Sequence, residues 1–263
     1  MFSNLTPVVK NLLLANVLIF ALSGLIRIDL VDIMGLRYVL ADQFAPHQLI
    51  TYMFMHGGWG HLFSNMFALF IFGPLLERFW GPKKFFLFYM ITGIGAGILY
   101  GMVNFYEVRQ VQTAAERYME SPNYESFTAF MAEHASGYYS SIYDFIDDYG
   151  NNQDNGRYIE QSKVYVSQIY QQISNVPMVG ASGAVFGILM AFGLLFPNTE
   201  LMLLIPPMPV KAKYLVTFYG LYELYSGVQR NPGDNVAHWA HLGGMLIAYI
   251  LIRIWRNQRN TFY

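Results

Sequence analysis

The 263-residue sequence contains no cysteine and few charged side chains. Without cysteine the chain has no disulfide framework, no thiolate nucleophile and no cysteine-based zinc site. Lys, Arg, Asp and Glu together make up 13% of the residues, about half of what a soluble domain carries. The formal net charge of −1 provides no basic surface for nucleic acid. These shortages exclude cysteine chemistry, a soluble enzyme and a nucleic-acid-binding protein.

Hydrophobic residues are abundant instead, at 54% of the chain, with 21 Phe and 20 Tyr. The core of a water-soluble domain of this length cannot bury so many apolar side chains. A transmembrane helix needs about 20 mainly apolar residues. Six stretches approach that length: 8–26, 61–76, 85–106, 176–196, 214–228 and 236–252. Because these are continuous apolar runs, they favour helices over a barrel, and an all-α membrane protein with six transmembrane helices is expected.

Two of the six stretches need comment. The first is long and has no convincing cleavage site, so we interpret it as a retained transmembrane segment and not a signal peptide. The fifth is interrupted by Glu223, at a cost of about 2.5 to 3.5 kcal/mol if this side chain faces lipid. Glu223 is therefore expected to act as an internal acid or, more simply, to find a partner on an adjacent helix or in water.

The distribution of positive charge predicts the topology. With a cytoplasmic N-terminus, nine of the 16 Lys and Arg residues but only two of the 17 Asp and Glu residues fall on the cytoplasmic side. This partition follows the positive-inside rule. Both termini of this multi-pass protein are therefore predicted to be cytoplasmic.

A polar segment, 107–175, separates the third and fourth apolar stretches. It holds ten acidic residues, four basic residues and nine tyrosines. Its ends have helical spacing, with helix breakers at 121–123 and 151–156. We expect a helical extracytoplasmic insert, which divides the chain into helices one to three (1–106), the insert (107–175) and helices four to six (176–263).

Polar side chains inside transmembrane segments are costly, so each is a functional hypothesis. His61 and Asn65 are four residues apart near the outer end of the second stretch, on one helical face. Ser182 lies in a Gly-Ala-Ser-Gly sequence at the outer end of the fourth stretch, and His238 and His241 lie in the outer part of the sixth. In the expected topology these groups converge in one pocket.

The Gly-Ala-Ser-Gly sequence alone is a weak signal, because Gly183 and Gly187 also form a GxxxG packing motif. The two glycines after His241, at 243 and 244, add a second small-residue face. Two such faces can bring a serine and a histidine within hydrogen-bond reach, and an imidazole is a suitable base for a serine hydroxyl. His61 and Asn65 are of the types that stabilise an oxyanion.

Taken together, these motifs resemble the rhomboid family of intramembrane serine proteases. The matching residues are His-Leu-Phe-Ser-Asn at 61–65, continuing to Gly73 and Glu77, Gly-Ala-Ser-Gly at 180–183, and Ala-His-Leu-Gly-Gly at 240–244. The resemblance implies a six-helix rhomboid-like bundle. It also implies that Ser182 is the nucleophile, that His241 is the base of a dyad without a carboxylate, and that His61 and Asn65 form the oxyanion hole, with no cofactor and no metal.

Three further residues are expected to line the pocket. In the family pattern a glycine follows the base by three residues, which fits His241 and leaves His238 as a pocket-lining or hydrogen-bonding residue. His56 is expected to make a structural loop contact or to touch the oxyanion region. Phe186 is expected to pack over the base or within the core.

Two features depart from the family pattern. The 107–175 insert is unusually long, so the shape of the substrate entrance and of the loop before Ser182 is open. The Trp-Arg pair that is common in the first extracytoplasmic loop is missing, and Arg37-Tyr38 is the nearest feature.

The resemblance implies an endopeptidase that hydrolyses peptide bonds in or near the transmembrane helices of single-pass substrates, in a bacterial cytoplasmic membrane. The alternative is a catalytically inactive rhomboid-like protein that binds membrane clients. Other intramembrane proteases are disfavoured, because the chain has no HExxH motif and no pair of membrane aspartates.

Overall fold

The protein is mostly helical. The computed structural model describes residues 5–26, 28–203, 207–229, 234 and 236–259. The first half of the chain forms α1 (Pro7–Leu25), α2 (Leu30–Met34), α3 (Gln48–Thr51), the 3-10 helix η2 (Tyr52–Phe54), α4 (Trp59–Trp80) and α5 (Pro82–Glu120). The second half forms α6 (Tyr124–His134), the 3-10 helix η3 (Ser136–Ile142), α7 (Tyr143–Asn151), α8 (Gly156–Asn175), α9 (Ser182–Leu195), β1 (Glu200–Met202), β2 (Pro209–Lys211), α10 (Ala212–Gln229) and α11 (His238–Arg259).

Several of these helices are strongly apolar. Among the described helices, α1, α4 and α5 are long and apolar enough to cross a membrane, and α9 is apolar but shorter. This is consistent with an integral, multi-pass membrane protein. The remaining crossings of the expected six-helix layout stay a prediction.

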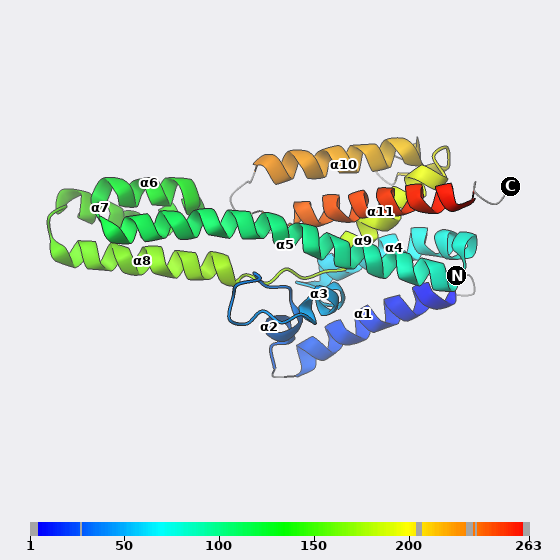
Figure 1. Cartoon of the computed structure of the whole chain (residues 1–263), viewed down its shortest axis with the longest axis horizontal. Helices are drawn as coiled ribbons and strands as arrows, with labels where there is room; N and C mark the ends of the chain where they lie inside the picture. Colours follow the sequence, from blue (N-terminus) through cyan, green and yellow to red (C-terminus); the bar gives the residue numbers. More distant parts are fainter. Residues whose placement is uncertain (1–4, 27, 204–206, 230–233, 235, 260–263) are drawn as a thin grey trace.

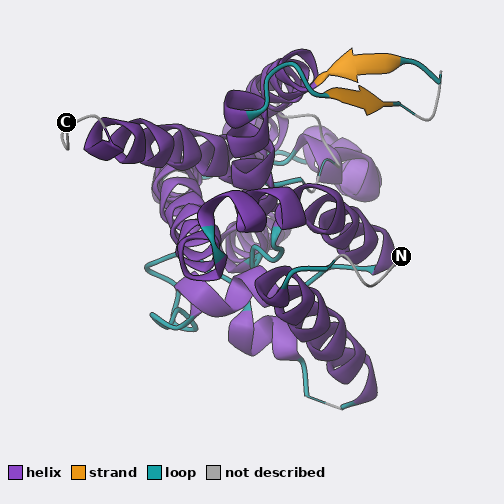
Figure 2. Cartoon of the chain, turned by 90° about the vertical axis from the view of Figure 1, so that its right-hand side faces the viewer, coloured by secondary structure: helices purple, strands orange, loops and turns teal. Residues whose placement is uncertain are grey.

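Helix α9 lies at the centre of the bundle. It packs against α4, α5, α10 and α11, and in Figure 1 these helices run alongside one another at one end of an elongated molecule. Figure 2, which looks toward that end, shows the bundle helices grouped around a shared interior. Because neighbours surround α9, its sequence is apolar on all sides, as expected for a buried helix.

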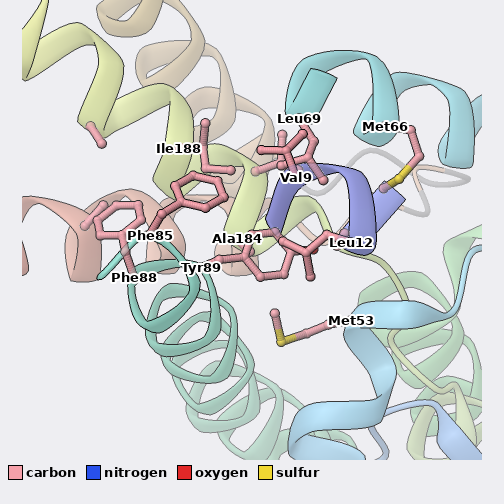
Figure 3. Close-up of a cluster of buried hydrophobic side chains, with 14 of the residues drawn as sticks. Val9, Leu12, Met53, Met66, Leu69, Phe85, Phe88, Tyr89, Ala184 and Ile188 are labelled. Atoms are coloured by element: carbon pink, nitrogen blue, oxygen red, sulfur yellow. The ribbon is translucent and has the colours of Figure 1, made fainter. Parts of the chain in front are cut away.

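The bundle core joins the N-terminal helix to the centre. Figure 3 shows side chains from α1, α4, α5 and α9 meeting in one cluster. Its buried members include Val9, Leu12, Met53, Leu69, Phe85, Tyr89, Ala184 and Ile188. One buried acid supports this junction, because both carboxylate oxygens of Glu77 accept backbone N–H groups of Val8 and Val9, at 3.1 and 2.9 Å. The carboxylate thus pairs the otherwise unsatisfied first turn of α1.

The insert does not begin as a separate segment after residue 106, where the expected division was placed. Helix α5 passes through this position without a break and ends at Glu120, because the sequence contains no Gly or Pro between 102 and 120 to stop it. The end of α5 then packs with α6, α7 and α8 around a second core, far from the α1 end of the molecule (Figure 1). Its fully buried members include Phe127, Met131, Tyr149 and Val166.

The fourth apolar stretch starts as a loop and not as a helix. Residues 176–181 form a loop without regular secondary structure apart from an isolated bridge at Met178, and α9 begins at Ser182. Within this loop Met178 exchanges both backbone hydrogen bonds with Leu36 at 2.8 Å, and Gly180 has a positive φ of 128°, which favours glycine. After α9 the antiparallel strands β1 and β2 pair with each other, which the apolar pattern did not predict, and they project from the bundle in Figure 2.

Helices α9 and α11 touch through glycine. A Cβ atom at Gly244 would lie 1.9 Å from the carbonyl oxygen of Gly183. On the other side of α9, a Cβ atom at Gly183 would lie 2.5 Å from Cβ of Ala96, and one at Gly187 would lie 2.8 Å from Cβ of Thr92. An added side chain would therefore collide with backbone at Gly244 and with the Cβ atoms of α5 at Gly183 and Gly187, so these glycines allow α5, α9 and α11 to pack closely.

Gly244→Ala is therefore expected to force α11 away from α9. We expect a loss of roughly 3 kcal/mol of stability or more, because the added methyl group meets backbone that cannot rotate away. The matched control is Gly101→Ala in α5, where a Cβ atom meets nothing within 4 Å. Thermal unfolding in detergent checks both variants, and equal unfolding temperatures would contradict the expectation.

Candidate active site

Ser182 and His241 meet where α9 and α11 are in contact. Ser182 is the first residue of α9, and His241 lies one turn into α11. The Oγ atom of Ser182 is 2.8 Å from Nε2 of His241, a hydrogen-bond distance. The two side chains are short, so this contact requires the close approach of helices that Gly183 and Gly244 permit.

Phe186 holds the imidazole of His241 from one face. The two rings are stacked, with centroids 4.1 Å apart and planes 6° apart. Because Phe186 is one turn after Ser182 on α9, one helix supplies both the hydroxyl and the surface on which the imidazole rests. Both expectations for Phe186 hold, because it stacks on His241 and also packs against the buried cluster of Leu189, Val216 and Met245.

The other ring nitrogen of His241 faces a carboxylate. Nδ1 of His241 is 2.8 Å from Oε2 of Glu223 on α10, although its N–H bond is not aligned with that oxygen as in a regular hydrogen bond. Glu223 is buried and faces the inside of the bundle. It therefore avoids the cost of facing lipid by pairing with an adjacent helix, and it stands beside a pair that sequence analysis expected to lack a carboxylate.

His238 extends this network toward the surface. Its Nδ1 is 2.5 Å from Oε2 of Glu223, and its Nε2 is 3.0 Å from Oδ2 of Asp234 in the loop before α11. The hydrogen bond from His238 lowers the pKa of Asp234. His238 and His241 face the same oxygen of Glu223, with ring centroids 6.2 Å apart, and Ser182 is not among the hydrogen-bond partners given for His238. The expected hydrogen-bonding role of His238 fits this position.

His61 and Asn65 approach the site from α4. A Cβ atom at Gly180 would lie 2.6 Å from Cε1 and Nε2 of His61, so the imidazole rests against the loop that leads to Ser182. The Nδ2 donor of Asn65 is buried and has no acceptor within the described residues. Both residues line the same cavity as Ser182 and His241.

The loop before Ser182 is fixed by the segment between α1 and α4. The backbone N–H of Gly180 donates to the carbonyl of Tyr52 at 2.9 Å. Arg37 is buried, forms an ion pair with Asp32 and donates to the carbonyl of Asn175 at 2.6 Å. Arg37 thus ties the first loop to the end of α8, a role that its position in the sequence left open.

A cavity of about 1150 Å³ connects the site to the insert. One wall contains Ser182, His241, His61 and Asn65, and the opposite wall comes from α5, α6, η3 and α8. Its described lining includes three acidic residues and neither Lys nor Arg; the acids are Glu107, Glu133 and Asp234. Figure 1 shows that the end of α10 and the start of α11 lie on the side of the bundle nearest the insert.

His56 is buried in the loop before α4. Its ring lies edge-on to that of His61, with centroids 5.1 Å apart, and neither ring nitrogen has a hydrogen-bond partner within the described residues. Burial lowers the pKa of His56 to about 4, and the neighbouring His61 adds to the effect. His56 therefore contacts the site through His61, and a backbone contact with Phe54 in its own loop partly opposes the lowering of its pKa.

Glu223, His238 and His241 are the described residues that could hold a metal ion, because one ligand atom from each lies within 4.8 Å of the others. The distances between these ligand atoms favour direct contact between the three side chains over a shared metal ion. Two ligands of a tetrahedral zinc ion, each about 2.0 to 2.1 Å from the metal, are roughly 3.3 Å apart. The N to O separations of 2.5 and 2.8 Å are shorter, as in direct contacts between the carboxylate and the two imidazoles.

The protein is a helical membrane bundle in which a serine and a histidine from different helices lie in contact. Sequence comparison shows the family to which it belongs. The Rhomboid domain matches residues 43–109 and 158–258, which is more than half of the chain. The protein belongs to the rhomboid family. Residues 110–157 lie between the two matched ranges, at the place of the insert.

Individual relatives match over shorter segments. The chain is 42% identical over 59 residues to Rhomboid-like protein 11, chloroplastic, of Arabidopsis thaliana, covering 22% of this chain and 21% of that protein. It is 43% identical over 47 residues to the Bacillus subtilis protein named "Putative rhomboid protease YdcA", covering 18% of this chain and 24% of that protein. The matches span about a fifth to a quarter of the length of these relatives.

The buried His56 predicts a loss of stability in mild acid. An unfolded histidine takes up its proton near pH 6.5, whereas folded His56 does so near pH 4. The unfolded state therefore binds more protons between these values, and stability falls as the pH falls through this window. From pH 7.5 to pH 5 the loss is about 2 kcal/mol.

Replacing the imidazole of His56 removes its contribution to the pH dependence of stability. His56→Phe is expected to flatten the dependence of the unfolding temperature on pH, whereas the exposed control His47→Gln keeps it. The measurement is thermal unfolding followed by tryptophan fluorescence between pH 4 and pH 8. Parallel curves for His56→Phe and the unmodified protein would assign the pH dependence to other groups.

Proposed function

We propose that this protein is an intramembrane serine protease that hydrolyses peptide bonds in or near the transmembrane helices of single-pass membrane proteins. The observation that supports this most directly is the 2.8 Å contact between Oγ of Ser182 and Nε2 of His241 beside a large cavity. Membership of a family with a relative named as a rhomboid protease supports the same reaction. Ser182 is the nucleophile and His241 the general base.

In the first step the Ser182 hydroxyl attacks the substrate carbonyl. As Oγ forms its bond to the carbonyl carbon, the hydroxyl proton moves to Nε2 of His241, and the carbonyl oxygen becomes an oxyanion. The buried amide donor of Asn65, the His61 imidazole and the backbone N–H groups at the start of α9 supply hydrogen bonds and positive dipole to that oxygen.

The second half of the reaction needs water. His241 returns its proton to the leaving amine as the C–N bond breaks, which leaves an acyl group on Ser182. A water molecule then loses a proton to His241 and attacks the acyl carbon, and the proton goes back to Ser182 when the acid product leaves. The cavity that reaches the insert provides the route for this water from the outer side.

The proposed topology has six crossings and both termini in the cytoplasm. α1, α4, α5, α9, α10 and α11 cross the membrane, so that the insert lies outside and Ser182 lies near the outer boundary. A substrate helix must unwind locally to present its carbonyl. Substrates with small or helix-breaking residues near that boundary are therefore preferred, because such residues lower the cost of unwinding.

Ser182→Ala and His241→Ala are each expected to abolish cleavage of a transmembrane reporter, because either change removes one half of the reacting pair. The matched control is Ser23→Ala on α1, whose hydroxyl binds a carbonyl of its own helix and which is expected to retain activity. The assay uses purified protein in liposomes.

Labelling with a fluorophosphonate separates the protease from an inactive client-binding protein. Ser182 of a protease reacts with this reagent, and Ser182→Ala does not. The assignment as a protease would be refuted if cleavage survived both substitutions, or if Ser182 of the wild-type protein never reacted with the fluorophosphonate.

The insert is proposed to control access to the site. Its helices form the outer wall of the cavity, and the segment 107–175 carries ten acidic and four basic residues. A substrate segment that leaves the membrane beside the site passes along this acidic wall. Basic residues near the outer end of a substrate helix are therefore favoured.

Deleting residues 110–172 tests this role. The deletion joins α5 to the end of α8, two helices that pack together, through a short linker. We expect faster cleavage of substrates without an ectodomain and a reduced preference for basic juxtamembrane sequences. The measurement is kcat/KM for a panel of reporters, and unchanged values across the whole panel would leave the insert without a role in access.

A further inference from the structure

The buried carboxylate beside His241 is not used by the proposed two-residue mechanism. We infer that Glu223 is a positioning residue for His241, and that Asp234, His238, Glu223, His241 and Ser182 form one continuous chain of proton-sharing contacts. This role rests on the proposed function of Ser182 and His241. It adds a third group, a carboxylate, to their pair.

The placement of Glu223 is costly without such a role. A carboxylate in the interior of an apolar bundle keeps its charge only when it is paired or hydrogen-bonded. The other buried acid of the bundle, Glu77, accepts two backbone N–H groups of α1 and so supports the fold. Glu223 instead directs one oxygen at two imidazoles, with 2.5 Å to Nδ1 of His238 and 2.8 Å to Nδ1 of His241. Its partners are therefore ionisable side chains and not backbone groups.

The position of the Ser182 proton explains why His241 needs this acceptor. Nε2 can accept the hydroxyl proton only when it carries none, so the neutral ring holds its single proton on Nδ1. Oε2 of Glu223 lies 2.8 Å from Nδ1. A small rotation of either side chain aligns the N–H bond with it, and such contacts commonly tighten when substrate binds. Glu223 thereby selects the reactive tautomer and stabilises the imidazolium that forms during attack.

His238 and Asp234 hold the carboxylate in place. His238 bridges Oε2 of Glu223 and Oδ2 of Asp234 through its two ring nitrogens, and its side chain is only 7% exposed. Glu223 cannot turn away from His241 without losing this bridge. Phe186 restrains His241 from one face by stacking, so both members of the contact are fixed.

Other charged and titratable groups near His241 come from every helix around it. α4 contributes His61, and α5 contributes Tyr100 and Glu107 to the cavity wall. α9 contributes no ionisable side chain except the Ser182 hydroxyl. Of the groups on these helices and on α10 and α11, Glu223 is the acid in direct contact with the His241 ring.

The test compares Glu223→Gln with the unmodified protein. Glutamine has the same shape and can still bond to His238, so the fold is expected to persist, but the negative charge is gone. We expect kcat for a transmembrane reporter to fall about 10²- to 10⁴-fold, with KM nearly constant, as for other carboxylates that orient a catalytic imidazole. The acidic limb of the pH–rate profile should move to lower pH by about one unit or more, because the imidazolium loses its counter-charge.

Two further variants make the result specific. Glu223→Asp keeps the charge on a shorter side chain and is expected to recover part of kcat and the original acidic limb. The matched control is Glu200→Gln, which removes an exposed acid on the hairpin and should change neither quantity. If Glu223→Gln keeps kcat within about threefold with an unmoved acidic limb, the positioning role is wrong. If Glu223→Gln lowers the unfolding temperature but leaves the acidic limb of the pH–rate profile in place, the positioning role is also wrong, because Glu223 then has a purely structural role.

Failure of this inference and failure of the protease can be told apart. If wild-type protein neither cleaves a reporter nor reacts with a fluorophosphonate, the protease is refuted. The contact itself is then decided by NMR of protein with ¹⁵N-labelled histidine. A strongly deshielded Nδ1 proton of His241 that disappears in Glu223→Gln supports the contact, and a proton signal that is the same in both proteins overturns it.

Discussion

The contact between α9 and α11 is the constraint on which the rest of the structure depends. Serine has one side-chain atom beyond Cβ, so its hydroxyl can reach an imidazole on another helix only if the two backbones nearly touch. Gly183 and Gly244 make this possible, because a single methyl group at Gly244 would collide with the carbonyl of Gly183. In a bilayer, where lipid is as apolar as the helices, such close packing is also a main source of helix association. The same small residues therefore serve stability and the site.

Buried polar groups at the two ends of the bundle have different kinds of partner. At the end where the chain begins, Glu77 pairs with backbone and holds α1 against α4. At the opposite end Glu223, His238 and His241 pair with one another, and Arg37 secures the loop before Ser182 through a carbonyl of α8. An apolar interior penalises every unpaired group, and several buried polar atoms lack a partner in the described structure. Among them the donor of Asn65 lines the cavity beside Ser182, which suits it to an oxyanion.

The sequence was informative where a physical rule acts locally. Apolar runs located α1 and α10 to within two residues, although α5 extends well beyond its apolar run, and the spacing of small residues suggested that α9 and α11 could meet. It was less informative where a distant contact decides the outcome. The loop at 176–181 is apolar enough for a helix, but the pairing of Met178 with Leu36 and the positive φ of Gly180 keep it out of the helical conformation. The carboxylate of Glu223 could be recognised as unusual, but its partners lie on a helix that begins beyond the intervening loop, and no spacing rule links them.

Helix α5 belongs to both halves of the molecule. Its 39 residues make a rod of about 58 Å, with no interruption between the bundle and the insert. Its inner part packs against α9 at Gly183 and Gly187, while its outer part forms one side of the insert core. The described part of α5 has no break between the insert core and the glycine contact beneath Ser182, so a tilt of the insert would move both ends of one rigid helix together.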